Sequence, residues 1–349
     1  MINEASFNQI VQGKQVGLFT LATPDGITAQ ITNYGAKIVS LLVPNAEGEV
    51  ADVVLGFSTL DEWLTQEVYF NGINGRTAGR VSGAQFDIDG TTYHVTQNAG
   101  EHCLHGGYHG FNDKVWDIVE VSNSAIKLHY LSPDGEEGFP GNLHVYVTYL
   151  LQGKDLVINY EANTDAPTIL NLTNHAYFNL GGYASGSIHD HILQMDADSY
   201  VRTDEGLIPT GELATVEGTP FDFRTAKRVG QDIGADNADL KIAGGYDHCF
   251  NFTGGETKEP VLRATLKDPK SGRIMKMYTN QPCVQLYTGN FLADDGYPFK
   301  GGLVKSKQMA LCLETQHMPD SINHDNFTNV ILDACEKYDY TTIYAFSAE

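Results

Sequence analysis

Apolar and polar residues alternate with a period of two along much of this chain. The alternation recurs in short runs at 26–34, 36–44, 92–96, 125–133, 143–151, 155–163, 273–279, 283–291 and 341–347. Such runs are typical of strands with one buried face, and the glycine, asparagine, aspartate and proline residues between them favour turns. Helical periodicity is scarce, with one short helical turn predicted at 59–65. The pattern therefore predicts antiparallel sheets rather than parallel strands that alternate with helices.

No internal repeat, low-complexity tract or proline- and serine-rich linker divides the chain. Its 349 residues, of which 42% are hydrophobic, are enough to bury a large core. The 36 glycines suit the many turns and bulges of an antiparallel architecture. We therefore expect an all-β fold, a large antiparallel β-sandwich that spans residues 1–349 as a single domain.

The charge balance limits the partners of the protein. It has 44 acidic and 22 basic residues, which give a net charge of −22. Nucleic acids and anionic membrane surfaces both require a basic surface, so neither is an expected partner. The five cysteines are widely spaced and form no CxxC pair, which favours reduced thiols. With no signal peptide and no long apolar stretch evident, we expect a cytoplasmic protein.

A glycine-rich segment, NGINGRTAGRVSGAQF at 71–86, contains Arg76 and Arg80. Its glycine spacing is loosely similar to that of phosphate-binding loops, but no Walker-type lysine and no predicted helix follow it. An arginine in this segment can lie in a solvated loop, or its guanidinium can donate several hydrogen bonds to a neutral polyol. The segment by itself leaves both interpretations open.

Three histidines, His102, His105 and His109, lie in the segment EHCLHGGYHGFNDKVWD at 101–117. The glycines among them disfavour a regular helix, and no carboxylate lies at a familiar ligand spacing, so we expect no metal site. The aromatic neighbours favour a histidine in an aromatic-walled pocket for a small molecule. Structural packing is the alternative for His105 and for His109.

The segment NLTNHAYFNLGG at 171–182 places His175 among amides, aromatics and glycines. Asn171 and Asn174 can satisfy backbone groups where a strand bends. The ordinary pKa of histidine, about 6.5, lets a modest local field hold His175 protonated or neutral near physiological pH. A general acid or base needs this property, so His175 is a candidate catalytic residue, with a structural role as the alternative.

Near the end of the chain, Glu314 follows the apolar run MALCL within LCLETQHMPDSINHDNF. An isolated buried charge is costly, so this carboxylate is either paired, for example with an arginine, or functional. Two further polar side chains can contact hydroxyl groups. They are Asp247, in GGYDHCFNF, and Gln285, in CVQLYTGNF.

Taken together, these segments resemble the aldose 1-epimerase (galactose mutarotase) family. The resemblance extends from TNYGAKIVSLLVPNAEGEVADVVLGF to ETQHMPDSINHDNF, and LHGGYHGFNDKVW, NLTNHAYFNL, YTGNF and ETQHMPD occur in the order that the family uses. It implies a galactose mutarotase-like supersandwich with many strands, no metal or organic cofactor, and a shallow site for a sugar substrate on one sheet face.

The resemblance also implies roles for individual residues. Glu314 would be the general base and His175 the general acid. The substrate-binding residues would be Arg80, His105, Asp247 and Gln285. Many relatives have asparagine directly before the second arginine of the glycine-rich segment, where this chain has Gly79. One contact to a sugar hydroxyl is therefore missing here or is supplied from elsewhere.

The implied reaction, interconversion of the α and β anomers of free aldohexoses such as galactose and glucose, fits these residue types. The C1 hydroxyl must lose a proton while the ring oxygen gains one, which opens the ring. Rotation about the C1–C2 bond and reclosure then give the other anomer. A carboxylate and an imidazole suit the two proton transfers, and no metal or hydride carrier is required.

Three alternatives remain at this stage. A hexose-6-phosphate 1-epimerase would gather extra arginine or lysine around C6 of the sugar, and this acidic chain offers few. A glycoside hydrolase could use Glu314 and Asp247 as its carboxylate pair. A carbohydrate-binding protein without turnover would need the aromatics and amides but not an acid and a base.

Overall fold

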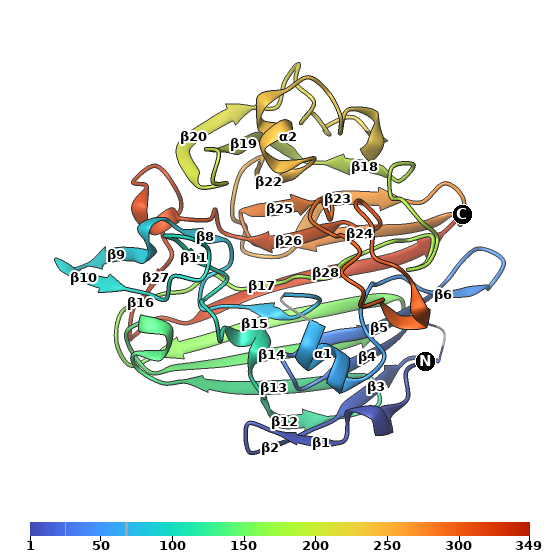
Figure 1. Ribbon diagram of the computed structural model, residues 1–349, viewed down its shortest axis with the longest axis horizontal. Coiled ribbons are helices and arrows are strands. Elements are labelled where there is room, and N and C mark those ends of the chain that lie inside the picture. Colours follow the sequence, from blue (N-terminus) through green and yellow to red (C-terminus); the bar gives the residue numbers. More distant parts are fainter. Residues whose placement is uncertain (25, 67–68) are drawn as a thin grey trace.

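Three antiparallel β-sheets form the body of the computed structural model, which describes residues 1–24, 26–66 and 69–349 (Figure 1). The largest has nine strands in the order β12 (Asp117–Val121), β13 (Ala125–Ser132), β14 (Leu143–Gln152), β15 (Asp155–Thr164), β28 (Tyr338–Ala348), β24 (Arg273–Thr279), β23 (Val261–Lys267), β18 (Ile192–Met195) and β21 (Lys227–Arg228). A five-stranded sheet has the order β20 (Pro209–Thr215), β19 (Ala197–Thr203), β22 (Asp247–Phe252), β25 (Cys283–Tyr287) and β26 (Cys312–Gln316). A four-stranded sheet has the order β3 (Leu18–Ala22), β4 (Thr28–Thr32), β5 (Lys37–Pro44) and β6 (Val50–Asp52).

Short strand pairs and helices complete the fold. The pairs are β1 (Gln9–Val11) with β2 (Lys14–Val16), β7 (Ile73–Asn74) with β17 (Thr173–Asn174), β8 (Arg80–Val81) with β11 (Cys103–Leu104), β9 (Gln85–Ile88) with β10 (Thr91–His94), and β16 (Thr168–Ile169) with β27 (Ile331–Leu332). In the described part of the chain the α-helices are α1 (Leu60–Gln66) and α2 (Ala238–Ala243). Single turns of 3-10 helix cover Glu4–Phe7, Ser82–Ala84, Phe111–Asp113, Glu136–Gly138, Val229–Gln231, Lys300–Gly302 and Ser321–Asn323. No helix among the described residues is long and apolar enough to cross a membrane.

The three sheets share one apolar core, and the alternation in the sequence explains why. Along β14, every second side chain is buried, from Leu143 through Val147 to Leu151. These side chains belong to a cluster that also contains residues of the four-stranded and five-stranded sheets, such as Ile31 and Leu313. Because successive side chains of a strand point to opposite faces, period-two alternation gives each sheet one face for this core.

The strands predicted from alternation are confirmed. Each of the nine predicted runs contains residues of a strand, namely β4, β5, β10, β13, β14, β15, β24, β25 and β28. The predicted helical turn at 59–65 corresponds to α1. The antiparallel β-sandwich class is likewise confirmed, since every paired strand of the three large sheets is antiparallel to its neighbours.

The last strand of the chain lies in the middle of the largest sheet. Figure 1 shows β28 running between β15 and β24, and it pairs with both over most of its length. Its Tyr344 side chain is buried and donates a hydrogen bond to the carbonyl of Leu313 in β26, over 2.9 Å. This contact links the nine-stranded sheet directly to the strand that carries Glu314.

Candidate active site

One face of the five-stranded sheet forms the floor of a pocket of about 240 Å³. In the register of this sheet, Cys249 lies opposite Gln285, and Gln285 lies opposite Glu314. Because every second residue of a strand points to the same face, the pocket is lined by alternate residues of three neighbouring strands. These residues are Asp247, Cys249, Gln285, Tyr287, Glu314 and Gln316.

The other walls come from segments that are distant in the sequence. Gly79, Arg80, Leu104 and His105 lie at the β8–β11 pair, and His175 and Tyr177 directly follow β17. The pocket thus brings together all six residues predicted from the sequence. They are Arg80, His105, His175, Asp247, Gln285 and Glu314. The remaining lining residues are Tyr69, Val201, Thr203, Leu207, Pro209, Phe291 and Pro319.

Backbone hydrogen bonds hold His175 in place. Its N–H donates to the carbonyl of Gly72 over 3.0 Å, and its carbonyl accepts from the N–H of Asn71 over 3.0 Å. The Asn71 side chain accepts from the N–H of Tyr177 and donates to two other carbonyls, so this buried amide fixes the segment. The His175 ring also stacks on the Tyr177 ring, with centroids 4.9 Å apart and planes at 11°. The imidazole is therefore held by both its backbone and its ring.

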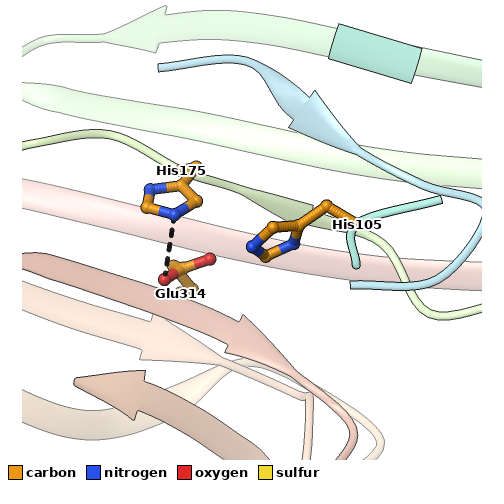
Figure 2. Close-up of side chains that lie close together, drawn as sticks. All are labelled: His105, His175 and Glu314. Carbon is orange, nitrogen blue, oxygen red and sulfur yellow. Dashed lines mark ion pairs between the residues drawn. The ribbon is translucent and has the colours of Figure 1, made fainter. Parts of the chain in front are cut away.

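His175 and Glu314 face each other across the pocket. Nε2 of His175 lies 3.6 Å from Oε1 of Glu314, and the two side chains are only 6% and 3% exposed. Figure 2 shows that both side chains point into the space that His105 also faces. Nδ1 of His175 and Oε2 of Glu314 have no hydrogen-bond partner among the described residues.

Burial disfavours the charged form of each group in this pair. It lowers the pKa of His175 to about 3, and the positive charge of Lys37 adds to the lowering. Burial raises the pKa of Glu314 well above its ordinary value, and the negative charge of Asp247 adds to the rise. Above a pH of about 3 His175 is therefore neutral, while Glu314 keeps its proton up to the raised pKa of its carboxyl group. Over this range the pair carries one titratable proton.

His105 is held as a neutral hydrogen-bond donor. Its Nδ1 accepts from the N–H of Gly79 over 3.1 Å, so in the neutral ring the proton lies on Nε2. Burial lowers the pKa of His105 well below its ordinary value, and the charge of Arg80, together with that of His175 when it is protonated, adds to this. His105 has a positive φ of 51°, a sparsely populated conformation for a residue with a side chain.

Asp247 and Gln285 form a polar pair on the pocket floor. Nε2 of Gln285 donates to Oδ1 of Asp247 over 2.7 Å, which leaves Oε1 of Gln285 without a partner among the described residues. Burial raises the pKa of Asp247, whereas the nearby charge of Arg80 and the hydrogen bond from Gln285 act to lower it. The pair offers hydroxyl groups an acceptor on each residue.

Gly79 has no room for a side chain. Its φ is +73°, and a Cβ atom at this position would lie 2.6 Å from Cβ of Pro319. An asparagine at this position would therefore need Pro319 to move. In this chain, position 79 contributes its backbone N–H to His105 instead.

The pocket donors do not fit a metal ion. His105, His175 and Glu314 have ligand atoms within 4.8 Å of one another. However, Nδ1 of His105 accepts the hydrogen of Gly79, so Nε2 carries the proton and presents no lone pair to the pocket. With His105 excluded, two donors remain, which is fewer than the three protein ligands of ordinary catalytic zinc sites.

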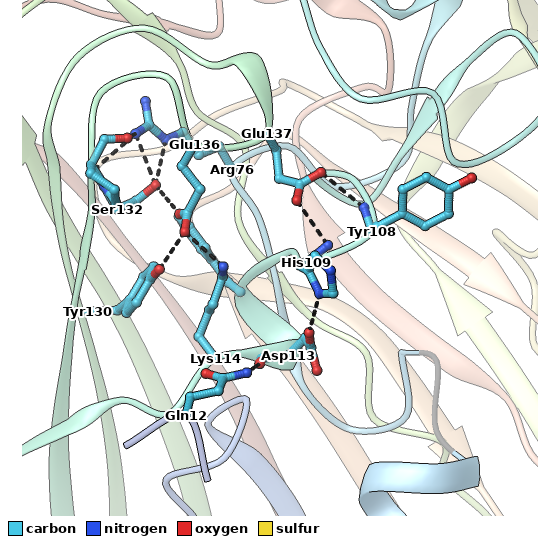
Figure 3. Close-up of polar contacts among 12 residues, drawn as sticks. Gln12, Arg76, Tyr108, His109, Asp113, Lys114, Tyr130, Ser132, Glu136 and Glu137 are labelled. Carbon is cyan, nitrogen blue, oxygen red and sulfur yellow. Dashed lines mark hydrogen bonds and ion pairs between the residues drawn. The ribbon is translucent and has the colours of Figure 1, made fainter. Parts of the chain in front are cut away.

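Arg76 lies neither in a solvated loop nor in the pocket, because it is buried elsewhere. Figure 3 shows its polar contacts with Ser132. Its guanidinium donates to the hydroxyl of Ser132 over 3.0 Å and to the carbonyl of Pro140 over 2.6 Å. Ser132 in turn donates to Glu136 over 2.5 Å. The Arg76 carbonyl accepts from the N–H of Asn171 over 2.9 Å, so this network supports the segment that leads to His175.

The two other histidines of the segment 101–117 do not line the pocket. His109 is exposed and forms an ion pair with Asp113 over 2.7 Å. His102 accepts a hydrogen bond from the N–H of Gly83 at the surface. Several other lining residues are not predicted from the sequence motifs, and alternation offers a signal for two of them. Tyr177 and Gln316 each lie two positions after a predicted catalytic residue and so share its side of the backbone.

An all-β sandwich whose pocket holds a buried acid–base pair is typical of an enzyme that works by proton transfer. Comparison with known proteins gives the family. Residues 17–345 match the family model described as aldose 1-epimerase. The chain is 42% identical to galactose mutarotase of Homo sapiens, over 99% of this chain and 98% of that protein. It is 35% identical to aldose 1-epimerase of Escherichia coli K12, over 97% of each chain.

Solved structures agree with the sequence relatives. An aldose epimerase homologue from C. elegans superposes with a TM-score of 0.88 at 31% identity, covering 95% of this chain and 99% of that one. Galactose 1-epimerase from Lactobacillus acidophilus superposes with a TM-score of 0.84 at 29% identity, covering 97% of each chain. The chain belongs to the aldose 1-epimerase family and is an isomerase.

Proposed function

We propose that this protein interconverts the α and β anomers of free aldohexoses such as galactose and glucose. The observation that carries the proposal is the buried pair of His175 and Glu314, 3.6 Å apart in a pocket lined by groups that bind hydroxyls. The family supports the reaction, and galactose in the names of its relatives supports that sugar as a substrate.

Glu314 acts as the general base and His175 as the general acid. Glu314 takes the proton of the C1 hydroxyl while His175 gives a proton to the ring oxygen, and the ring opens to the aldehyde. After rotation about the C1–C2 bond, both transfers run backward. Each group ends the cycle as it began, so no further reagent is consumed.

The protonation state of the pair is compatible with these roles. Burial favours a neutral imidazole beside a carboxylic acid, whereas the reaction starts from an imidazolium beside a carboxylate. Both arrangements contain the same number of protons, so a transfer between His175 and Glu314 converts one into the other. Sugar hydroxyls that donate to Glu314 favour its charged form, because hydrogen bonding to a carboxylate stabilises the charge.

The substrate-binding roles follow from the donors and acceptors in the pocket. Nε2–H of His105 and the guanidinium of Arg80 donate to sugar oxygens, and Asp247 and Gln285 accept from hydroxyls. This division is supported by the hydrogen bonds that occupy the other atoms of His105 and Gln285. Such groups suit a neutral polyol, which needs both donors and acceptors.

The alternatives are less well supported. A phosphorylated hexose needs several cations, but Arg80 is the only lysine or arginine among the described lining residues, and Asp247 lies in the same pocket. A binding protein without turnover gains nothing from a buried histidine–carboxylate pair. A hydrolase remains chemically distinct, because it must break the bond between C1 and its exocyclic oxygen.

We also propose that the chain forms a single domain and that it is cytoplasmic. One core cluster draws residues from Leu21 to Phe346, which supports a single domain over 1–349. A cytoplasmic location is supported by the cysteines, all of which are free thiols in the structure.

Polarimetry of freshly dissolved α-galactose and α-glucose in ¹⁸O-labelled water tests the proposal. We expect faster mutarotation and no enzyme-dependent label in the sugar, because ring opening leaves the exocyclic oxygen bonded to C1. A sample without enzyme measures the slow exchange of the open aldehyde. Label that appears in step with epimerisation would indicate glycosyl transfer instead.

A further inference from the structure

We propose that Gln316 is a further sugar-binding residue, which contacts two neighbouring hydroxyls on ring carbons other than C1. The inference rests on the proposed epimerase function and names a specificity determinant of the same pocket. Gln316 lines the pocket and is only 1% exposed. Neither its Oε1 nor its Nε2 has a hydrogen-bond partner among the described residues.

An amide with both polar atoms buried and unpaired requires an explanation. Nearly all buried polar groups in proteins have at least one partner, because losing the bonds to water without replacement is costly. The other glutamine of the pocket floor has a partner for one of its two polar atoms, since Nε2 of Gln285 donates to Asp247. Gln281, which is buried outside the pocket, donates to the carbonyl of Thr315 over 3.0 Å. Of these three glutamines, Gln316 is therefore the one whose amide nitrogen and oxygen are both available to a ligand.

The residue directly opposite Gln316 in the neighbouring strand offers it no strong partner. The residue directly opposite it in β25 is Cys283, and a thiol is only a weak donor and acceptor. Cys283 and Met318 belong to a buried apolar cluster with Val201, Cys249 and Phe327. The pocket is thus the direction in which polar partners for this amide can lie.

The register of β26 indicates which part of the sugar Gln316 contacts. Gln316 lies two residues after Glu314 and on the same face, so the two side chains leave the strand about 7 Å apart. With the C1 hydroxyl at Glu314, the amide lies about one ring width away, beside hydroxyls that do not react. A primary amide donates through Nε2 and accepts through Oε1, so it complements two adjacent hydroxyls without adding charge.

Kinetics with deoxy sugars test this inference. The parent hexose is compared with its 2-, 3-, 4- and 6-deoxy analogues, using wild type and Gln316→Leu. We expect the variant to lose about 10-fold or more in kcat/KM on the parent sugar, the scale of two neutral hydrogen bonds, mainly through KM. The one or two analogues that lack the contacted hydroxyls should lose much less than the parent. An equal loss on all sugars, or no loss, overturns the inference.

A matched variant separates binding from stability. Gln281→Leu removes a buried glutamine next to the same strand but outside the pocket, so it should lower the melting temperature and leave the ratios between sugars unchanged. If Gln316→Leu does not fold, Gln316→Glu retains the shape and an acceptor but loses the amide donor, and it should lower kcat/KM selectively on sugars with the contacted hydroxyls. Unchanged ratios in that variant also overturn the inference. Failure of the proposed function is distinguishable, because wild type would then accelerate mutarotation of no aldose.

Discussion

The N–H of Gly79 donates to Nδ1 of His105 over 3.1 Å, and the carbonyl of Gly79 accepts from the N–H of His105 over 2.9 Å. Two bonds thus join the glycine-rich segment to the histidine segment, and the first of them decides the tautomer of a pocket histidine. The position of the His105 proton therefore depends on a backbone amide rather than on a carboxylate. This relationship links the local geometry of Gly79 to substrate binding.

Gly79→Ala is expected to lower stability and raise KM. The substitution places a side chain at a positive φ and brings its Cβ to 2.6 Å from Pro319, so Pro319 or the backbone that bonds to His105 must shift. Gly90→Ala is the matched control, because Gly90 has a φ of +78° but no atom within 4 Å of a Cβ. Urea denaturation should show about 1 kcal/mol lost in Gly90→Ala and more in Gly79→Ala. Equal losses and equal KM values in the two variants would contradict the prediction.

Glu314→Gln and His175→Asn are each expected to lower kcat by about 10²-fold or more. Each change removes a group proposed to carry a proton in both half-reactions, while the buried shape is nearly kept. Circular dichroism should show an unchanged fold. His109→Asn, which alters an exposed histidine outside the pocket, is expected to retain normal turnover. Near-normal turnover in either pocket variant would remove that residue from the mechanism.

His105→Asn and Asp247→Ala are expected to raise KM about 10-fold as well as to lower kcat. Both residues present hydrogen-bonding atoms to the pocket, and contacts to the sugar act in the ground state and in the transition state. Initial rates measured over a wide range of sugar concentrations separate the two parameters. A fall in kcat with unchanged KM would indicate that these residues do not bind the ground-state sugar.

Stability is expected to fall as the pH drops below about 6.5. Burial lowers the pKa of His191, His248 and His317 to about 4, so between pH 6.5 and 4 the unfolded chain binds protons that the folded chain does not. Each of these histidines should cost about 2 kcal/mol of unfolding free energy by pH 5. The raised pKa of Glu314 acts in the opposite direction and offsets part of this.

Thermal melts at pH 7.5, 6 and 5 measure the effect. His317→Gln should lower stability at pH 7.5, because it disturbs the hydrogen bonds to Thr328 and Tyr340. The same variant should show a smaller loss of stability between pH 7.5 and 5, because the contribution of one histidine is removed. A melting temperature that stays constant down to pH 5 would show that these histidines titrate normally in the folded protein.

Exhaustive treatment with EDTA is expected to leave the activity unchanged. The reason is the proton on Nε2 of His105, which leaves the group of His105, His175 and Glu314 with too few lone pairs for a metal ion. Activity is measured before and after dialysis against EDTA and again after zinc is added back. A loss that zinc reverses would show that His105 adopts the other tautomer.

Alternation in the sequence predicts nine of the 28 strands of the described residues, because a strand with one buried face must alternate apolar and polar residues. The strand β14 is an example, with every second residue buried along its length. Alternation fails for β22, where His248, Cys249 and Phe250 are buried in succession because both faces of that strand are covered. The place of β28 between β15 and β24 is also absent from the pattern, since alternation says nothing about which strands pair.

The functional residues are likewise predicted from the sequence only in part. The cost of burying an unpaired carboxylate makes Glu314 a candidate from the sequence, and the ionisation of imidazole near neutral pH makes His175 another, while the family resemblance implies their roles. Their spacing of 3.6 Å is a property of the tertiary structure, as is the difference between Arg76, which is bound to backbone carbonyls, and Arg80, which lines the pocket. Composition and periodicity are local properties of the chain. They therefore predict strands and the kinds of functional group that are present. Strand register and the packing of sheets join residues distant in sequence, so only the tertiary structure decides which of those groups share one pocket.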